Sequence, residues 1–319
     1  MEHAIFAEGL RKRYGKVEAL RGVDISVPRG AVLGMLGPNG AGKTTTIRIF
    51  STLLQPDEGH ATVAGFDVVK DPEKVRQRIG LAGQNVTLDN RLTGRENLKL
   101  IGVLHGLKRP AAKARAAELL ERFELTDAAD RVTQTYSGGM RRRLDLAACV
   151  LAHPAVLFLD EPTIGLDPAS RQVLWRLIRE HVAQGATVLL TTQYLEEVDE
   201  LTDHVLVVDK GQVIAYGTSD ELKRRVGGER LEVAPVLASE VPTVVAALGR
   251  VAAAEPVVAG SGLSVSVPLT GGVADVAVVA MALSDAGVEL ADFAVRRPSL
   301  VEVFLNLTDQ STELQRSAA

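Results

Sequence analysis

The chain has 319 residues, enough for two domains at roughly 100–200 residues each. Hydrophobic residues make up 46% and charged residues 24%, as in an ordinary globular protein, and the net charge of −4 argues against attachment to nucleic acid mainly by charge. A single cysteine, Cys149, excludes an internal disulfide framework and fits a reducing compartment. We expect neither a secretory signal nor a membrane-spanning helix, because no apolar run reaches the ~18 residues that a span needs.

Strand-like and helical patterns alternate through about residue 225, which predicts a doubly wound α/β domain. The apolar run 31–36 predicts a strand covered on both faces, and helical spacing follows Lys43. Thr93 and Glu96 have the spacing of a capping box, so a helix should begin there. Residues of about 88–150 are predicted to form a helical subdomain, with helix at 110–123. Further strands are predicted at 156–160, 186–192 and 204–217.

The composition changes near residue 226, so we predict domains at 1–226 and 227–308. The second domain shows strand and helix patterns in the order β-α-β-β-α-β, which is typical of a small α+β domain of ferredoxin-like type. Any short α+β domain could give the same order. A last helix is predicted at 299–307, and the polar tail 309–319 is predicted to be disordered. This domain could regulate the first, stabilise a dimer, or simply pack against it.

A glycine-rich segment, GPNGAGKT, follows the strand at 31–36 and opens a helix. In this context the pattern predicts a phosphate-binding loop, because backbone N–H groups can point at phosphate oxygens beside the positive end of a helix. Lys43 would reach the β- and γ-phosphates, and the Thr44 hydroxyl would ligate Mg²⁺. The alternative is a purely structural turn. The predicted ATP contacts of this loop are Gly37, Pro38, Asn39, Gly40, Ala41, Gly42, Lys43, Thr44 and Thr45.

Two acids end the apolar strand VLFLD and begin the next loop. The Asp160 carboxylate can hold Mg²⁺ through water, and Glu161 could polarise the attacking water as a general base. An acidic pair that caps a helix is the alternative, but a phosphate-binding loop in the same chain favours the catalytic interpretation.

The stretch YSGGMRRRL is expected to open another helix. Ser137, Gly138 and Gly139 would make a second phosphate site at its N-terminus, which a chain needs only if two copies sandwich ATP. Alone, Ser-Gly-Gly is more typical of a flexible turn. The arginines at 141–143 are predicted to be a solvated helix face.

The ordered motifs GPNGAGKTT, YSGGM, LFLDEPT, GLDP and TTQYLEE resemble those of ATP-binding cassette (ABC) transporter ATPase subunits over residues 4–225. YSGGMRRRLD, TTQYLEE and the C-terminal RRPSLVEVFLNLT are similar to the daunorubicin-resistance type of drug-efflux ATP-binding subunit. The resemblance implies a P-loop NTPase fold of ABC type with a helical subdomain.

Further roles come from the resemblance. It implies that Tyr14 stacks on adenine; the alternative is a half-buried edge residue with no role in binding. It implies that Gln84 touches Mg²⁺ and the attacking water, and that Asp167 lies in a loop that crosses the dimer interface beside Glu161. An isolated Asp-Pro would merely mark a turn.

The sequence departs from the family pattern at two places. In the signature, usually LSGGQ, Tyr136 and Met140 replace Leu and Gln, so the polar interaction of the final Gln is lost while the phosphate-binding core is intact. Gln193 stands where most of the superfamily has histidine. Its amide can donate to the γ-phosphate but never protonates, so the activation of water falls on Glu161. A polar strand end that faces solvent is the alternative.

The resemblance implies an ATP hydrolase that uses ATP and Mg²⁺, with Lys43, Glu161 and Gln193 as catalytic residues. It implies a homodimer on ATP binding and a separate multi-spanning membrane permease as partner, with this chain bound peripherally at the cytoplasmic face of the cell membrane. The exported compound would be a hydrophobic drug or a lipid-like molecule. The competing hypothesis is a cassette ATPase that acts on ribosomes or nucleic acid, which the single cassette and the acidic charge disfavour.

Overall fold

The computed structural model describes residues 3–83, 88–226, 228–252, 254–260, 262–270, 272–297, 299–300 and 302–304. The chain divides into two compact units, Met1–Ser219 and Asp220–Ala319, earlier than the boundary expected after residue 226. Helix α8 (Ser219–Val226) lies at this division. None of the described helices combines the length and the apolar composition that a membrane span requires.

A six-stranded sheet with the order β10-β9-β3-β8-β7-β6 forms the centre of the first unit. Strands β3, β7 and β8 are buried at every residue, because helices and a second sheet cover both of their faces. The bounds are β3 (Val32–Leu36), β6 (Ile79–Ala82), β7 (Val156–Asp160), β8 (Thr187–Thr192), β9 (His204–Asp209) and β10 (Gln212–Gly217). All neighbours are parallel except β9 and β10. The predicted α/β class is confirmed.

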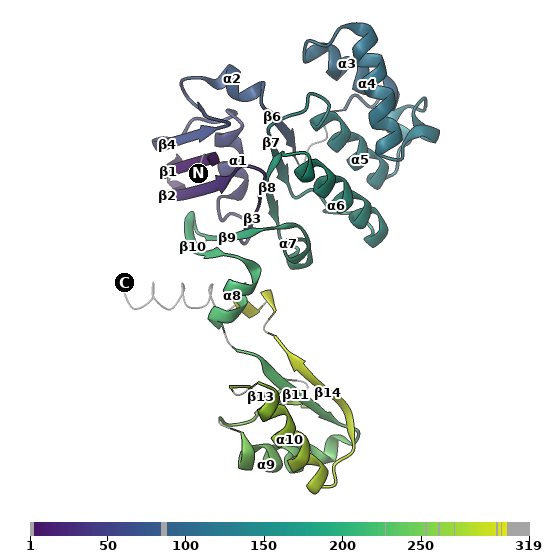
Figure 1. Ribbon diagram of the computed structural model, residues 1–319. Coiled ribbons are helices and arrows are strands. Elements are labelled where there is room, and N and C mark those ends of the chain that lie inside the picture. Colours follow the sequence, from purple (N-terminus) through teal and green to yellow (C-terminus); the bar gives the residue numbers. More distant parts are fainter. Residues whose placement is uncertain are drawn as a thin grey trace. The chain divides into compact units, whose positions relative to one another are not determined.

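A second, antiparallel sheet of order β2-β1-β4-β5 was not predicted from the sequence. It consists of β1 (His3–Tyr14), β2 (Val17–Pro28), β4 (Glu58–Val63) and β5 (Phe66–Asp67). One buried core joins it to helix α1 (Lys43–Phe50) and to the parallel sheet, with Ile5, Phe50 and Phe158 among its members. Figure 1 shows α1 and this sheet on the same side of the parallel strands.

Helices α3, α4 and α5 form the helical subdomain, grouped together in Figure 1. Helix α3 begins with the predicted capping box, because Thr93 Oγ1 accepts from the amide of Glu96 while the Glu96 carboxylate accepts from the amide of Thr93. The bounds in this region are α3 (Gly94–Leu104), α4 (Arg109–Arg122), the 3₁₀ helices Thr126–Ala128 and Thr133–Thr135, and α5 (Gly138–Cys149). The remaining helices of the first unit are α2 (Pro72–Arg76), α6 (Pro168–Ala183) and α7 (Leu195–Leu201).

The second unit contains the expected order of strands and helices, and its strands form one antiparallel sheet of order β12-β13-β11-β14. Its elements are β11 (Arg230–Pro235), a 3₁₀ helix (Ala238–Glu240), α9 (Val241–Val251), β12 (Val257–Val258), β13 (Val265–Pro268), α10 (Val273–Asp285) and β14 (Leu290–Arg296). A separate apolar core lies between the sheet and the two helices. Residues 300 and 302–304 are helical, within the predicted last helix, and the predicted disordered tail lies outside the described residues.

Candidate functional site: the carboxyl edge of the parallel sheet

Three neighbouring strands deliver the predicted catalytic residues to one edge of the sheet. Strands β3, β8 and β7 are adjacent and parallel, with Leu36 paired to Thr192 and Asp160 paired to Thr191. The carboxyl ends of parallel strands meet at the same edge. The phosphate-binding loop, the acidic pair and Gln193 therefore leave the sheet side by side.

The glycine-rich loop passes so close to its neighbours that side chains would not fit. A Cβ atom at Gly37 would lie 2.3 Å from the carbonyl oxygen of Val208. At Gly42, where φ is +108°, a Cβ atom would lie 2.7 Å from the carbonyl oxygen of Ala19. Helix α1 begins directly after Gly42, at Lys43. The loop thus has the tight curl and the following helix N-terminus that suit the phosphates of a nucleotide.

The side chain of Lys43 is buried and lies within this loop. Its ammonium donates to the carbonyl oxygens of Gly37 at 2.7 Å and Pro38 at 3.1 Å. Burial lowers the pKa of Lys43, and the nearby carboxylates of Glu161 and Asp160 oppose that shift. A cation placed here, with two acids nearby, suits a triphosphate that carries a divalent metal.

Asp160 is held between two hydroxyls. The Thr44 hydroxyl donates to Oδ2 of Asp160 at 3.0 Å, and the buried Thr191 hydroxyl donates to Oδ1 at 2.5 Å. Hydroxyl and carboxylate oxygens are hard ligands of the kind that Mg²⁺ prefers. The predicted pair Thr44 and Asp160 therefore fits a magnesium site, whereas the third predicted ligand, Gln84, lies outside the described residues.

Glu161 directly follows the strand end and has an unusual backbone. Its φ of +52° is left-handed, which costs a non-glycine residue roughly 1 kcal/mol or more, so the surroundings must hold it. Its amide donates to the carbonyl oxygen of Thr191 at 3.0 Å and to the Thr191 hydroxyl at 3.1 Å. The backbone that carries the predicted base is therefore fixed by the neighbouring strand.

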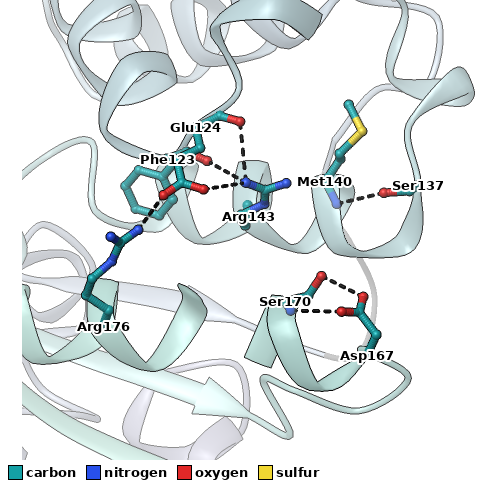
Figure 2. Close-up of polar contacts among 8 residues, drawn as sticks. All are labelled: Phe123, Glu124, Ser137, Met140, Arg143, Asp167, Ser170 and Arg176. Atoms are coloured by element: carbon teal, nitrogen blue, oxygen red, sulfur yellow. Dashed lines mark hydrogen bonds and ion pairs between the residues drawn. The ribbon is translucent and has the colours of Figure 1, made fainter. Parts of the chain in front are cut away.

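The prediction that Arg141, Arg142 and Arg143 form a solvated helix face was wrong. Arg142 is buried and donates to backbone carbonyls around Glu161, and the other two are half-buried. Arg143 donates to the carbonyl oxygen of Phe123 and to the carboxylate of Glu124, as Figure 2 shows. Around the axis of α5, the three arginines therefore face other parts of the protein rather than water.

Gln193 and Tyr14 are both accessible. Gln193 is exposed at the bend after β8, one residue beyond the Thr192–Leu36 pair that precedes the phosphate-binding loop. Tyr14 is 45% exposed at the end of β1, and the following strand β2 contains Ala19, which packs against Gly42. The two side chains can therefore meet a ligand, although their predicted roles stay predictions.

The Ser-Gly-Gly turn starts α5, and Ser137 is its N-cap, accepting from the amide of Met140 at 3.2 Å. The turn lies against the start of α6, because a Cβ atom at Gly139 would be 2.7 Å from Ser170 Oγ. The amide and the hydroxyl of Ser170 both donate to Asp167, the N-cap of α6 (Figure 2). These bonds lower the pKa of Asp167. The predicted partner-facing residues thus lie next to one another, with Ser137, Gly138 and Asp167 exposed.

Tyr136, which replaces the leucine of the usual signature, has a structural role. Its side chain is buried, and its hydroxyl donates to the carbonyl oxygen of Ala128 at 2.6 Å. Burial raises the pKa of Tyr136. Gly94 makes room for the ring, since a Cβ atom there would lie 2.3 Å from the Tyr136 hydroxyl. The substitution therefore anchors the turn to the helical subdomain and leaves Ser137 accessible.

Two functional residues, Thr191 and Arg142, were missed from the sequence. Thr191 is a polar residue near the end of a buried strand, and such a residue must find a partner. Arg142 lies three residues before Asp145 on a helix, which is ion-pair spacing. These signals could have marked both residues as buried and paired, but not what they contact.

The family profile described as ABC transporter matches residues 20–164. The daunorubicin resistance ATP-binding protein DrrA2 of Streptomyces coeruleorubidus is 53% identical over 311 residues, which cover 98% of this chain and 97% of that protein. The doxorubicin resistance ATP-binding protein DrrA of Mycobacterium tuberculosis is 47% identical over 314 residues, 97% of this chain and 95% of that protein. A solved structure of the ATP-binding subunit of an ABC transporter is 29% identical, with a TM-score of 0.64, and covers 70% of this chain and 92% of its own.

Proposed function

Because the chain belongs to the ATP-binding subunits of ABC transporters, which hydrolyse ATP, we propose that it powers export of a hydrophobic drug or lipid-like compound through a separate permease. The observation that carries this proposal is the similarity to drug-resistance subunits over nearly the full length of both chains. It extends beyond the cassette into the second unit, which begins at Asp220.

In the proposed reaction, Lys43 binds the β- and γ-phosphates, and Thr44 and Asp160 would hold Mg²⁺. The metal would neutralise charge that develops on the transferred phosphoryl group. Glu161 accepts the proton of the attacking water, with its backbone fixed by Thr191. Gln193 donates its amide to the γ-phosphate, and Tyr14 stacks on the adenine.

We propose that the second half of each ATP site comes from another copy of the chain. Ser137, Gly138 and Gly139 present a hydroxyl and backbone amides at the N-terminus of α5 and would bind the γ-phosphate held by the partner's loop. Asp167 lies beside this turn and would cross the same interface. Two copies would then close head-to-tail on two ATP molecules.

An apolar groove is the proposed docking surface for the permease. Its volume is about 450 Å³, and it lies between the helical subdomain and the strand β6 that leads to Gly83. Leu53 and Leu104 line it and are 64% and 76% exposed, which is unusual for large apolar side chains. A permease segment bound here would contact Leu81, three residues before Gln84 in the sequence. This arrangement would place the chain at the cytoplasmic face of the membrane.

The proposal is tested by placing Glu161→Gln in the natural host and measuring accumulation of a fluorescent anthracycline. We expect accumulation to rise to the level of a strain that lacks the gene, at equal protein abundance. Unchanged accumulation, together with salt-sensitive binding of the purified chain to nucleic acid, would favour the ribosome or nucleic-acid alternative.

A further inference from the structure

One buried side chain, that of Arg142, connects helix α5 to the backbone at the carboxyl ends of the adjacent strands β6 and β7. Its Nε donates to the carbonyl oxygen of Pro162 at 2.7 Å, and its Nη1 donates to that of Gly83 at 2.6 Å. Its Nη2 donates to the carbonyl oxygens of Glu161 at 3.1 Å and Asp160 at 3.3 Å. Each of the three guanidinium nitrogens therefore donates to at least one backbone carbonyl oxygen at the edge of the sheet that carries the predicted base.

The charge of Arg142 is balanced within its own helix. Nη1 also donates to Oδ2 of Asp145 at 3.3 Å, one turn along α5, and the Asp145 carboxylate is buried as well. An isolated buried charge is costly, so the ion pair with Asp145 and the hydrogen bonds to the four carbonyl oxygens must form together. A lysine would keep the charge, but its single ammonium cannot reproduce the planar fork that serves carbonyls on different segments.

The segments that Arg142 joins have different parts in the proposed reaction. Helix α5 starts at the Ser-Gly-Gly turn of residues 137–139, called the Ser137 turn below, which is proposed to bind the nucleotide of the partner. The carbonyls of residues 160–162 belong to the loop that carries Glu161. Gly83 directly precedes Gln84 in the sequence. A movement of α5 against the sheet must therefore carry these segments along or break the bonds.

The backbone of Glu161 is held from two sides. Thr191 binds its amide and Arg142 binds its carbonyl oxygen, on a residue whose φ is +52°. Thr191 belongs to the rigid sheet, whereas Arg142 belongs to the helix of the Ser137 turn. The orientation of Glu161 thus depends on where α5 lies.

We propose that Arg142 is a positioning residue that couples the Ser137 turn to Glu161 of the same chain. Binding of that turn to ATP on the partner would then align Glu161 for hydrolysis of the chain's own ATP. This inference rests on the proposed two-copy ATP site. Through Arg142 of each copy, the two ATP sites of a dimer would act cooperatively.

The test uses the full chain with Mg²⁺ and ATP, and it compares Arg142→Lys with Arg143→Lys. Arg143 is the matched control, because it lies on the same helix and bonds to Phe123 and Glu124 within the helical subdomain (Figure 2). For Arg142→Lys we expect kcat to fall about 10- to 100-fold with little change in the KM for ATP, and the Hill coefficient for ATP to fall toward one. Arg143→Lys should keep the wild-type values.

A second measurement keeps Arg142 in place. In the Glu161→Gln chain, amide hydrogen exchange is followed over residues 137–143 and 156–166 as the ATP concentration rises. The coupling predicts that both segments gain protection with one midpoint. Different midpoints, or wild-type kcat and Hill coefficient in a folded Arg142→Lys chain, would overturn the coupling alone. Failure of the Glu161→Gln chain to form an ATP-dependent dimer would instead overturn the proposed two-copy site.

Discussion

Three residues expected to act on the phosphates and the metal of the chain's own ATP differ in burial from two residues expected to act on the partner's ATP. Lys43, Asp160 and Glu161 are buried at the sheet edge, where backbone and hydroxyl groups of neighbouring segments fix them. Ser137 and Asp167 lie at helix N-termini and are exposed. The first set is preorganised within one chain, whereas the second is available to a partner.

The difference in burial indicates which steps of the reaction one chain can perform alone. A preorganised phosphate loop is expected to bind ATP in the isolated chain, because its contacts come from one unit. Hydrolysis needs charge stabilisation around the whole γ-phosphate, and part of that would come from the exposed set of another copy. ATP binding and ATP hydrolysis should therefore respond differently to substitutions in the buried set and in the exposed set.

The largest effect is expected from Glu161→Gln, which removes the proposed base from the buried set. We expect turnover to fall by about 10²- to 10⁴-fold, the range typical of a lost general base. ATP affinity should change little, because the amide keeps the size of the side chain and Lys43 is untouched. Steady-state ATPase assays and equilibrium binding of a fluorescent ATP analogue measure the two quantities. A variant that hydrolysed ATP at the wild-type rate would show that Glu161 is not the base.

An intermediate effect is expected from Thr191→Val, which removes the hydroxyl that holds Asp160 and the amide of Glu161. Loss of a residue that orients a metal ligand typically costs about 10- to 100-fold in metal affinity. We therefore expect ATP binding to require a higher concentration of Mg²⁺. With Mn²⁺ in place of Mg²⁺, electron paramagnetic resonance measures the bound metal directly and should show the same weaker binding. Thr191→Ser keeps the hydroxyl and should restore the wild-type requirement. Equal metal affinity in all three chains would contradict the arrangement.

The smallest effect concerns Glu197, a fully buried carboxyl on α7, four residues after Gln193 in the sequence. Its Oε1 accepts from Nε1 of Trp175, the single tryptophan of the chain, at 3.2 Å, and burial raises its pKa. An acid with a raised pKa in the folded state stabilises that state less as the pH rises through the folded pKa.

We therefore expect Glu197→Gln to gain stability relative to wild type as the pH rises above the usual range of a glutamate. Thermal unfolding between pH 5 and 8, followed by Trp175 fluorescence, measures this difference. A melting temperature difference that did not vary with pH would show that burial does not perturb Glu197.

The local structure of the candidate site was largely predictable where it depends on residues that are close in sequence. The GPNGAGKT loop, the two acids at the end of β7 and the capping box at Thr93 each depend on residues a few positions apart. The antiparallel sheet was not predicted, because β1 pairs with β4 across a long segment that contains β2, β3 and α1. The contacts of Thr191 and Arg142 depend on strand register and helix phase relative to Asp160, which only the fold determines.

The most direct test of the two-copy ATP site combines Ser137→Arg with Glu161→Gln. The Glu161→Gln chain is expected to form a dimer when ATP is added, as measured by light scattering after gel filtration. A large cation at position 137 would block the exposed turn while the buried loop stays intact. The double variant should therefore remain monomeric and still bind one ATP per chain. A double variant that dimerised with ATP as readily as Glu161→Gln would contradict the account.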